Sequence, residues 1–94
     1  MTYAIVRLVV KDFDPWKKVF DEAIPLRRSY GSRGARVFRS LDHPNELVLL
    51  AEYEDLDRTR QLFQSPEFRE ATQRAAVTAP PDVTLTDQVH QVAA

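Results

Sequence analysis

Apolar residues recur along the chain with two different periods. Four short stretches rich in β-branched and apolar residues predict strands, at residues 3–10, 34–41, 47–53 and 83–89. Between the first and second stretches, and again between the third and fourth, apolar residues follow helical spacing with charged residues on the opposite side. The predicted order is therefore strand, helix, strand, strand, helix, strand.

Capping residues and prolines set the predicted helix boundaries. Asp14 followed by Pro15 is typical of a helix start, with the aspartate as N-cap and the proline at the first helical position. Pro25 lacks the N–H that an uninterrupted helix would use, so it should kink the first helix or start a separate turn. Asp55 is the predicted N-cap of the second helix, and Ser65 before a proline predicts that a further helical segment begins there.

This order is the βαββαβ pattern of the ferredoxin-like fold. We therefore predict a single α+β domain over residues 1–94, with a four-stranded antiparallel sheet and helices on one of its faces. In that topology the first and third strands are central. These two strands are apolar on both faces, as buried strands are, whereas the second and fourth alternate more, as edge strands do.

The sheet face turned away from the helices is also apolar. Strand parity assigns several large apolar residues to it: Tyr3, Ile5, Val9, Phe38, Val48 and Leu50. Leaving roughly 500 Å² or more of such surface exposed is unusual for a monomer. Packing two sheets face to face would cover it, so we predict a homodimer in preference to scattered surface apolar residues.

Two charged residues, Arg7 and Glu52, interrupt the apolar central strands on this same face. Burying a charge is costly unless it is paired. We interpret the two as a charged pair of the dimer face, forming a salt bridge within the chain or across the interface. The alternative is a pair that handles a proton or binds an anion.

Composition excludes several classes of function. The absence of cysteine removes disulfides, iron–sulfur clusters and thiolate nucleophiles, and the two histidines, His43 and His90, have no metal-ligand spacing, so we expect no metal. With 13 basic and 14 acidic residues, the chain has no general attraction for nucleic acid or anionic membrane. There is no apolar run long enough to span a bilayer and no signal-peptide pattern, so a cytoplasmic protein is expected.

Segments along nearly the whole chain resemble small proteins of the dimeric α+β-barrel superfamily, which includes antibiotic biosynthesis monooxygenase-like domains. The likeness lies in VKDFDPWKKVFDE at 10–22, PLRR at 25–28, DHPNE at 42–46 and SPE at 65–67. It implies a dimer joined through its sheets and a pocket between sheet and helices in each subunit. It does not imply one chemistry, because the superfamily holds cofactor-free oxygenases, isomerases, haem-handling enzymes and non-catalytic members.

The predicted ligand pocket lies between the first helix and the sheet. Periodicity directs Leu8, Trp16, Phe20 and Ala23 into it, with Arg27 and Arg39 placed to meet an acidic end of an apolar ligand and Tyr53 to orient it. Similar chains often carry histidine where Leu8 and Ala23 stand, so no catalytic residue carries over and acid–base catalysis is less favoured. The alternative is that core packing closes this space.

We therefore expect a small-ligand pocket protein of monooxygenase-like type, needing no cofactor and acting on an apolar or aromatic small molecule. A non-catalytic binding module and a self-association domain are the alternatives. The residues alone leave open whether the chain is an enzyme.

Overall fold

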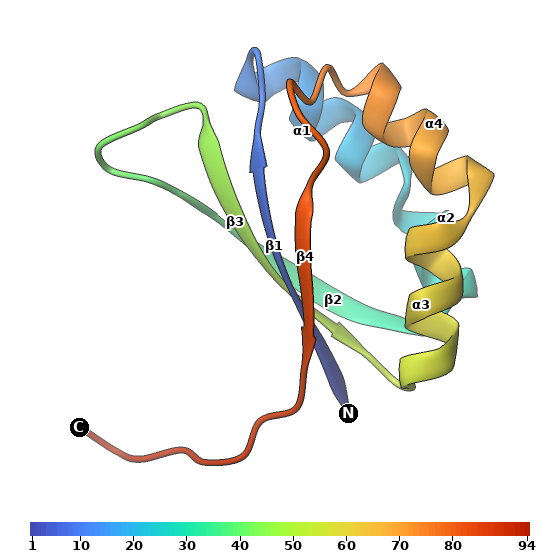
Figure 1. The fold of residues 1–94 in the computed structure, drawn as a ribbon, viewed down its shortest axis with the longest axis vertical. Coiled ribbons are helices and arrows are strands. Elements are labelled where there is room, and N and C mark those ends of the chain that lie inside the picture. Colours follow the sequence, from blue (N-terminus) through green and yellow to red (C-terminus); the bar gives the residue numbers. More distant parts are fainter.

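A computed structural model describes residues 1–94 as an antiparallel sheet with all its helices on one face (Figure 1). The strands are β1 (Thr2–Val9), β2 (Ser32–Arg39), β3 (Glu46–Tyr53) and β4 (Asp82–Thr86). The helices are α1 (Phe13–Glu22), α2 (Ile24–Ser29), α3 (Leu56–Gln64) and α4 (Pro66–Arg74). The spatial order β2-β3-β1-β4 confirms the predicted α+β fold and its central first and third strands.

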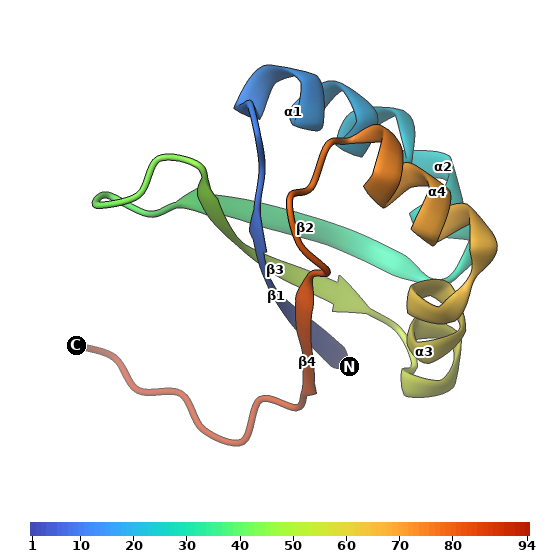
Figure 2. The ribbon, with the colours of Figure 1, turned by 45° about the horizontal axis from the view of Figure 1, so that its top comes forward.

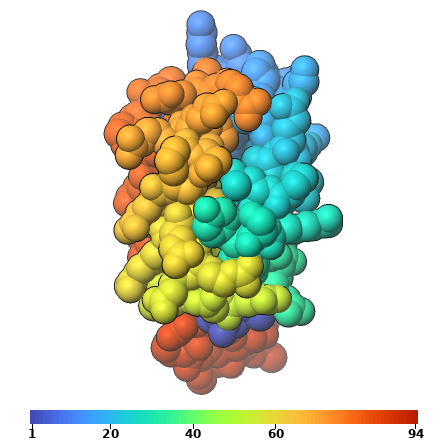
Figure 3. Space-filling model, turned by 90° about the vertical axis from the view of Figure 1, so that its right-hand side faces the viewer, coloured from blue at the N-terminus to red at the C-terminus, as the bar shows by residue number.

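The helix layer consists of two broken helices, each interrupted at a predicted position. Pro25 is in the first turn of α2, which confirms that a separate segment starts there. Ser65 caps α4, its hydroxyl accepting a hydrogen bond from the Phe68 N–H at 3.1 Å. Asp55 caps α3 as predicted. Figure 3 shows the pairs side by side, α3 and α4 in yellow to orange and α1 and α2 in blue to cyan.

The first helix begins earlier than predicted. Asp12, not Asp14, occupies the extended N-cap position before α1, and its side chain makes no capping hydrogen bond. Pro15 is therefore the third helical residue rather than the first. A proline is tolerated there because none of the first four N–H groups of a helix has an intrahelical partner.

Strand parity places the core as predicted. Ala4 of β1 lies between Ala51 and Leu85 on the neighbouring strands, and this row faces the helices. The buried core residues are Ala4, Val6, Leu8, Val10, Trp16, Leu47, Leu49, Ala51, Tyr53, Leu62 and Ala75. Alternate residues of β1 and β3 supply most of it, which is the pattern of a sheet with one covered face.

The two edge strands differ most from the predicted bounds, and β1 begins and ends one residue earlier than the predicted 3–10. β2 runs from Ser32 to Arg39 instead of 34–41, and just beyond its end the Ser40 hydroxyl accepts hydrogen bonds from the N–H groups of Asp42 and His43. β4 stops at Thr86 rather than 89. Thr86 pairs with Tyr3, which is one residue from the start of β1, so β1 offers almost no further partners. Residues 87–94 then extend away from the helices (Figure 2).

The face opposite the helices is uncovered by any part of the chain (Figures 1 and 2). It carries large apolar side chains that are substantially exposed: Ile5 is 37% exposed, Val9 43% and Phe38 49%. Leu50 and Val48 lie half-buried among them. None of the helices reaches the length and apolar character that crossing a bilayer requires.

Candidate functional site

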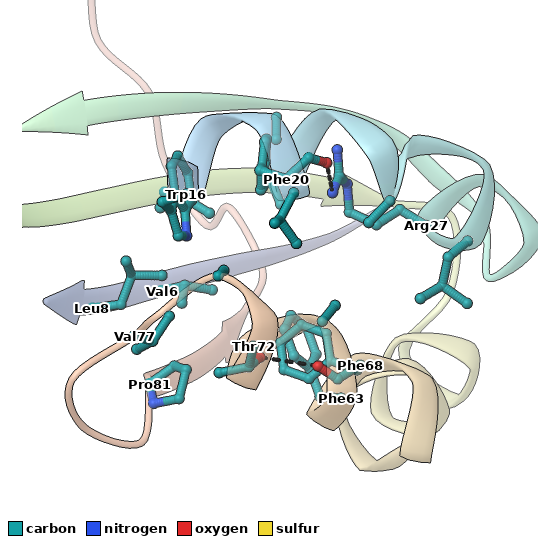
Figure 4. Close-up of a pocket in the computed structure, with 18 of the residues that line it drawn as sticks. Val6, Leu8, Trp16, Phe20, Arg27, Phe63, Phe68, Thr72, Val77 and Pro81 are labelled. Atoms are coloured by element: carbon teal, nitrogen blue, oxygen red, sulfur yellow. Dashed lines mark hydrogen bonds between the residues drawn. The ribbon is translucent and has the colours of Figure 1, made fainter. Parts of the chain in front are cut away.

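A cavity of about 80 Å³ lies between the sheet and the two helix pairs (Figure 4). Sixteen of its 19 lining residues are hydrophobic, so it favours an apolar occupant. The volume is well below the roughly 300 Å³ at which small-molecule sites begin. It is also smaller than an engineered cavity of about 150 Å³ known to hold benzene. A ring can therefore enter only if the walls move.

One wall of the cavity is aromatic. Trp16 and Phe20 stack with ring centroids 4.8 Å apart and an interplanar angle of 21°. They meet because residues four apart share one face of a helix. On the other side, Phe63 and Phe68 meet edge to face at 4.8 Å, where α3 passes into α4. Offset and edge-to-face arrangements of this kind are the favoured geometries of aromatic pairs.

Two polar groups on the wall have no partner within the chain. Trp16 is 3% exposed and Tyr53 1% exposed, and neither the indole N–H nor the phenol hydroxyl makes a hydrogen bond. No fully enclosed side-chain polar atom lacks a partner, so both groups keep some contact with open space, and both residues line the cavity. Figure 4 shows the Trp16 nitrogen on the side of the ring that faces β1. The Thr72 hydroxyl, by contrast, donates to the Phe68 carbonyl at 3.0 Å.

Arg27 brings a positive charge to the cavity rim. Its Nη1 donates to the Phe20 carbonyl at 2.7 Å, and its guanidinium carbon lies 3.9 Å from the Phe20 ring centroid (Figure 4). No carboxylate lies within ion-pair distance. Burial lowers the pKa of Arg27. The guanidinium nevertheless keeps its charge, as arginine does throughout the range in which proteins fold.

Tyr53 holds its proton at neutral pH. Burial raises the pKa of its phenol, and the nearby Arg27 charge offsets only part of that rise. A neutral phenol donates a hydrogen bond but does not act as a base. No histidine, aspartate or glutamate lines the cavity. The site can therefore orient a ligand and stabilise negative charge on it, while the pocket itself offers no general base.

We expect this raised pKa to appear in alkaline unfolding. The folded chain binds the Tyr53 proton more tightly than the unfolded chain does, so the contribution to stability is complete below pH 10.0, the ordinary tyrosine pKa, and is lost as the pH rises through the folded value. The free energy of unfolding should fall less steeply above pH 10 in Tyr53→Phe than in the wild type. Urea unfolding at stepped pH measures this, and identical slopes would contradict it.

The structure brings together six of the seven residues predicted to form the pocket. Leu8, Trp16, Phe20, Ala23, Arg27 and Tyr53 all line the cavity. Arg39 does not: its guanidinium carbon lies 4.4 Å from the centroid of the Phe13 ring, at the start of α1. The predicted pocket set left out Phe68, Ala71 and Thr72 of α4, and Ala75 at the C-cap of that helix. The helical spacing of these residues indicates that they share one face of a helix, but it does not indicate which part of the fold that face packs against.

Arg7 and Glu52 lie on the uncovered face, as strand parity predicts, yet they do not meet within the chain. Arg7 is in register with Val48 on β3, whereas Glu52 is in register with Tyr3, four residues earlier in β1. Neither makes an ion pair. Any pairing between these two residues would have to join different copies of the chain.

Comparisons with known proteins agree on one family. The sequence model of the antibiotic biosynthesis monooxygenase family matches residues 12–74. Two solved structures are similar over nearly their whole length. A candidate antibiotic biosynthesis monooxygenase from Bordetella bronchiseptica has a TM-score of 0.78 and 23% identity, covering 95% of this chain and 97% of that one. SnoaB, a cofactor-independent oxygenase from Streptomyces nogalater, has a TM-score of 0.78 and 18% identity, covering 97% and 95%.

A third structure, Rv0793 from Mycobacterium tuberculosis, has a TM-score of 0.70 and 21% identity, covering 98% of each chain. At these identities the structures establish the fold alone. No curated protein matches the chain. The family match covers about two thirds of the sequence, including both helix pairs and the two strands between them. The chain belongs to the antibiotic biosynthesis monooxygenase family.

Proposed function

We propose that this protein is a cofactor-independent oxygenase for a small aromatic compound, bound between the sheet and the helices. The observation that carries the proposal is the apolar helix–sheet cavity, walled by the Trp16–Phe20 stack, in a chain of this family. SnoaB, which shares the fold, is described as a cofactor-independent oxygenase. The unpartnered Tyr53 and Trp16 groups supply hydrogen-bond donors inside an otherwise apolar space.

Without a cofactor, the substrate must supply all the electrons that reduce O₂. A CH₂ group between two aromatic rings that also bear a carbonyl can do so after losing a proton to water to form an enolate. One oxygen atom becomes a new carbonyl on that carbon, and the other leaves as water with the two hydrogens. The Arg27 charge and the Tyr53 hydroxyl would stabilise the enolate in a low-dielectric site, so substrate acidity rather than a protein base would start the reaction.

Oxygen transfer to anthrone tests the proposal, because its central CH₂ has this chemistry and its product is anthraquinone. We expect anthraquinone to form faster with protein than without it, and to carry one label from ¹⁸O₂. Ala23→Leu, which extends a side chain into the cavity, should abolish the protein-dependent rate. Ala93→Leu, the same change in the exposed tail, should leave the rate unchanged.

The second candidate is a binding module with the same pocket and no catalysis. The lack of any histidine, aspartate or glutamate on the cavity wall favours it. Binding of anthrone that Ala23→Leu prevents, without protein-dependent turnover, would establish this alternative. Absence of both binding and turnover would overturn the proposed site.

We also propose that the working form is a homodimer joined through the uncovered sheet faces. The exposed Ile5, Val9 and Phe38 side chains support it, because exposed apolar patches of this kind mark association surfaces. Arg7 and Glu52 lie on opposite sides of the Ile5–Leu50 row, each two residues away from it along its strand. A two-fold axis along that row would set each Arg7 opposite Glu52 of the other copy.

A further inference from the structure

A second, larger space adjoins the apolar cavity. A groove of about 320 Å³ lies between the α1–α2 segment and the edge strand β2. Only three of its nine lining residues are hydrophobic, and three are arginines: Arg27, Arg28 and Arg33. Phe20, Arg27 and Ala35 line both the groove and the cavity, so these residues form the partition between the two spaces.

Arg27 is the only charged residue of this partition, and no carboxylate lies within ion-pair distance of its guanidinium. Its only partners are the carbonyl and the ring of Phe20. Asp21, the one acidic residue of the groove, is engaged by Lys17 at 2.9 Å. Arg28 also makes no ion pair, whereas Arg33 lies 3.7 Å from Glu54. A half-buried cation without a counter-charge is costly, and an anionic ligand would lower that cost.

We infer that the ligand is an aromatic anion, whose ring enters the apolar cavity beside Trp16 and whose carboxylate or phenolate binds Arg27 at the groove. Arg27 would then exchange the Phe20 carbonyl for the ligand anion, and the two spaces would open into one. Together they exceed the roughly 300 Å³ of a small-molecule site, which the cavity alone does not. The inference rests on the proposed helix–sheet binding site and names the class of ligand that it takes.

A structural role for Arg27 is the competing interpretation. Its hydrogen bond to the Phe20 carbonyl satisfies a carbonyl near the C-terminal end of α1, as basic side chains at helix ends do. A cap of that kind would affect stability. It would not make the protein distinguish an anionic ligand from a neutral ligand of the same shape, so this distinction decides between the two roles.

The decisive experiment compares two ligands that differ only in charge. Trp16 is the only tryptophan and lines the cavity, so its fluorescence reports occupancy there. We would titrate the full chain with 3-phenylpropanoate and with its neutral isostere 3-phenylpropanamide at neutral pH. The carboxylate should bind at least about tenfold more tightly, the magnitude of a single charge-assisted contact.

Arg27→Met removes the charge and keeps an apolar stem, and it should abolish the preference for the carboxylate. Arg60→Met removes the same charge from the exposed surface of α3, outside both spaces, and should preserve the preference. If Arg27→Met does not fold, the Arg27 side-chain N–H resonance of the wild type gives the same answer. It should shift on addition of the carboxylate and not on addition of the amide.

Equal affinity for the two ligands, no binding of either, or a preference that survives Arg27→Met would each overturn the inference. A lost charge preference would remove Arg27 from the stabilisation of the enolate, but it would not by itself stop uncharged anthrone from binding. Turnover of anthrone without charge preference would leave the oxygenase proposal standing alone. Charge preference without turnover would leave a binding site for aromatic anions.

Discussion

Leu50→Asp is expected to convert the proposed homodimer into folded monomers. Leu50 lies on the uncovered face, in register with Ile5 on β1 and Arg36 on β2. A face-to-face dimer would bury two new carboxylates there, and the neighbouring Arg36 offsets only part of that cost. The dimer dissociation constant should rise about 1,000-fold or more, which corresponds to about 4 kcal/mol.

The monomer should survive this substitution. Leu50 is not part of the buried core, which lies on the other face of the sheet. The matched control is Leu56→Asp, the same change at a leucine that is 38% exposed in the first turn of α3, within the helix layer. It should leave the dissociation constant unchanged.

Sedimentation velocity over a concentration series, with far-ultraviolet circular dichroism of each variant, measures both effects. A wild-type chain that is monomeric at tens of micromolar would contradict the dimer itself, since a stable interface is populated well below that concentration. A Leu50→Asp variant as dimeric as the wild type would show that the interface lies elsewhere on the surface.

The sheet could be predicted because its evidence is local and repeated. Every second residue of β1 and β3 is apolar toward the helices, and a shift of one residue would have turned that row outward. Boundaries were less predictable. Asp12 and Asp14 are equally good capping residues by type, and only the backbone path from β1 into α1 decides between them. β4 ends beside the start of β1, and that limit is set by β1 rather than by the residues of β4.

The same difference between local pattern and three-dimensional placement applies to the residues of the candidate site. Leu8, Trp16 and Phe20 could be assigned to it because a strand or helix period directs each toward the layer between sheet and helices. Arg39 was misplaced because its long side chain reaches to Phe13, and that contact depends on where α1 begins. The groove beside Arg27 could not be anticipated, because it depends on the spacing of α2 from β2 rather than on any residue pattern.

The two charged residues of the uncovered face, Arg7 and Glu52, are expected to contribute to the dimer rather than to the single chain. Within one chain Arg7 is exposed and Glu52 half-buried, and an exposed charge of this kind contributes little to stability. If a second copy covers both, removing either partner strands the other in the interface. Arg7→Ala and Glu52→Ala should then each weaken the dimer by about 3 kcal/mol, roughly 100-fold in dissociation constant.

A double-mutant cycle decides whether the two residues interact. The double variant should cost much less than the sum of the single ones. In the Leu50→Asp background the same substitutions should change monomer stability by less than about 0.5 kcal/mol, because no second copy covers the charges. The competing partner is Asp82, which is in register with Arg7 on β4. If Arg7 is coupled to Asp82 and the coupling persists in the monomer, Arg7 pairs within its own sheet. If the Arg7 and Glu52 substitutions are simply additive, these two residues do not form a pair at the interface.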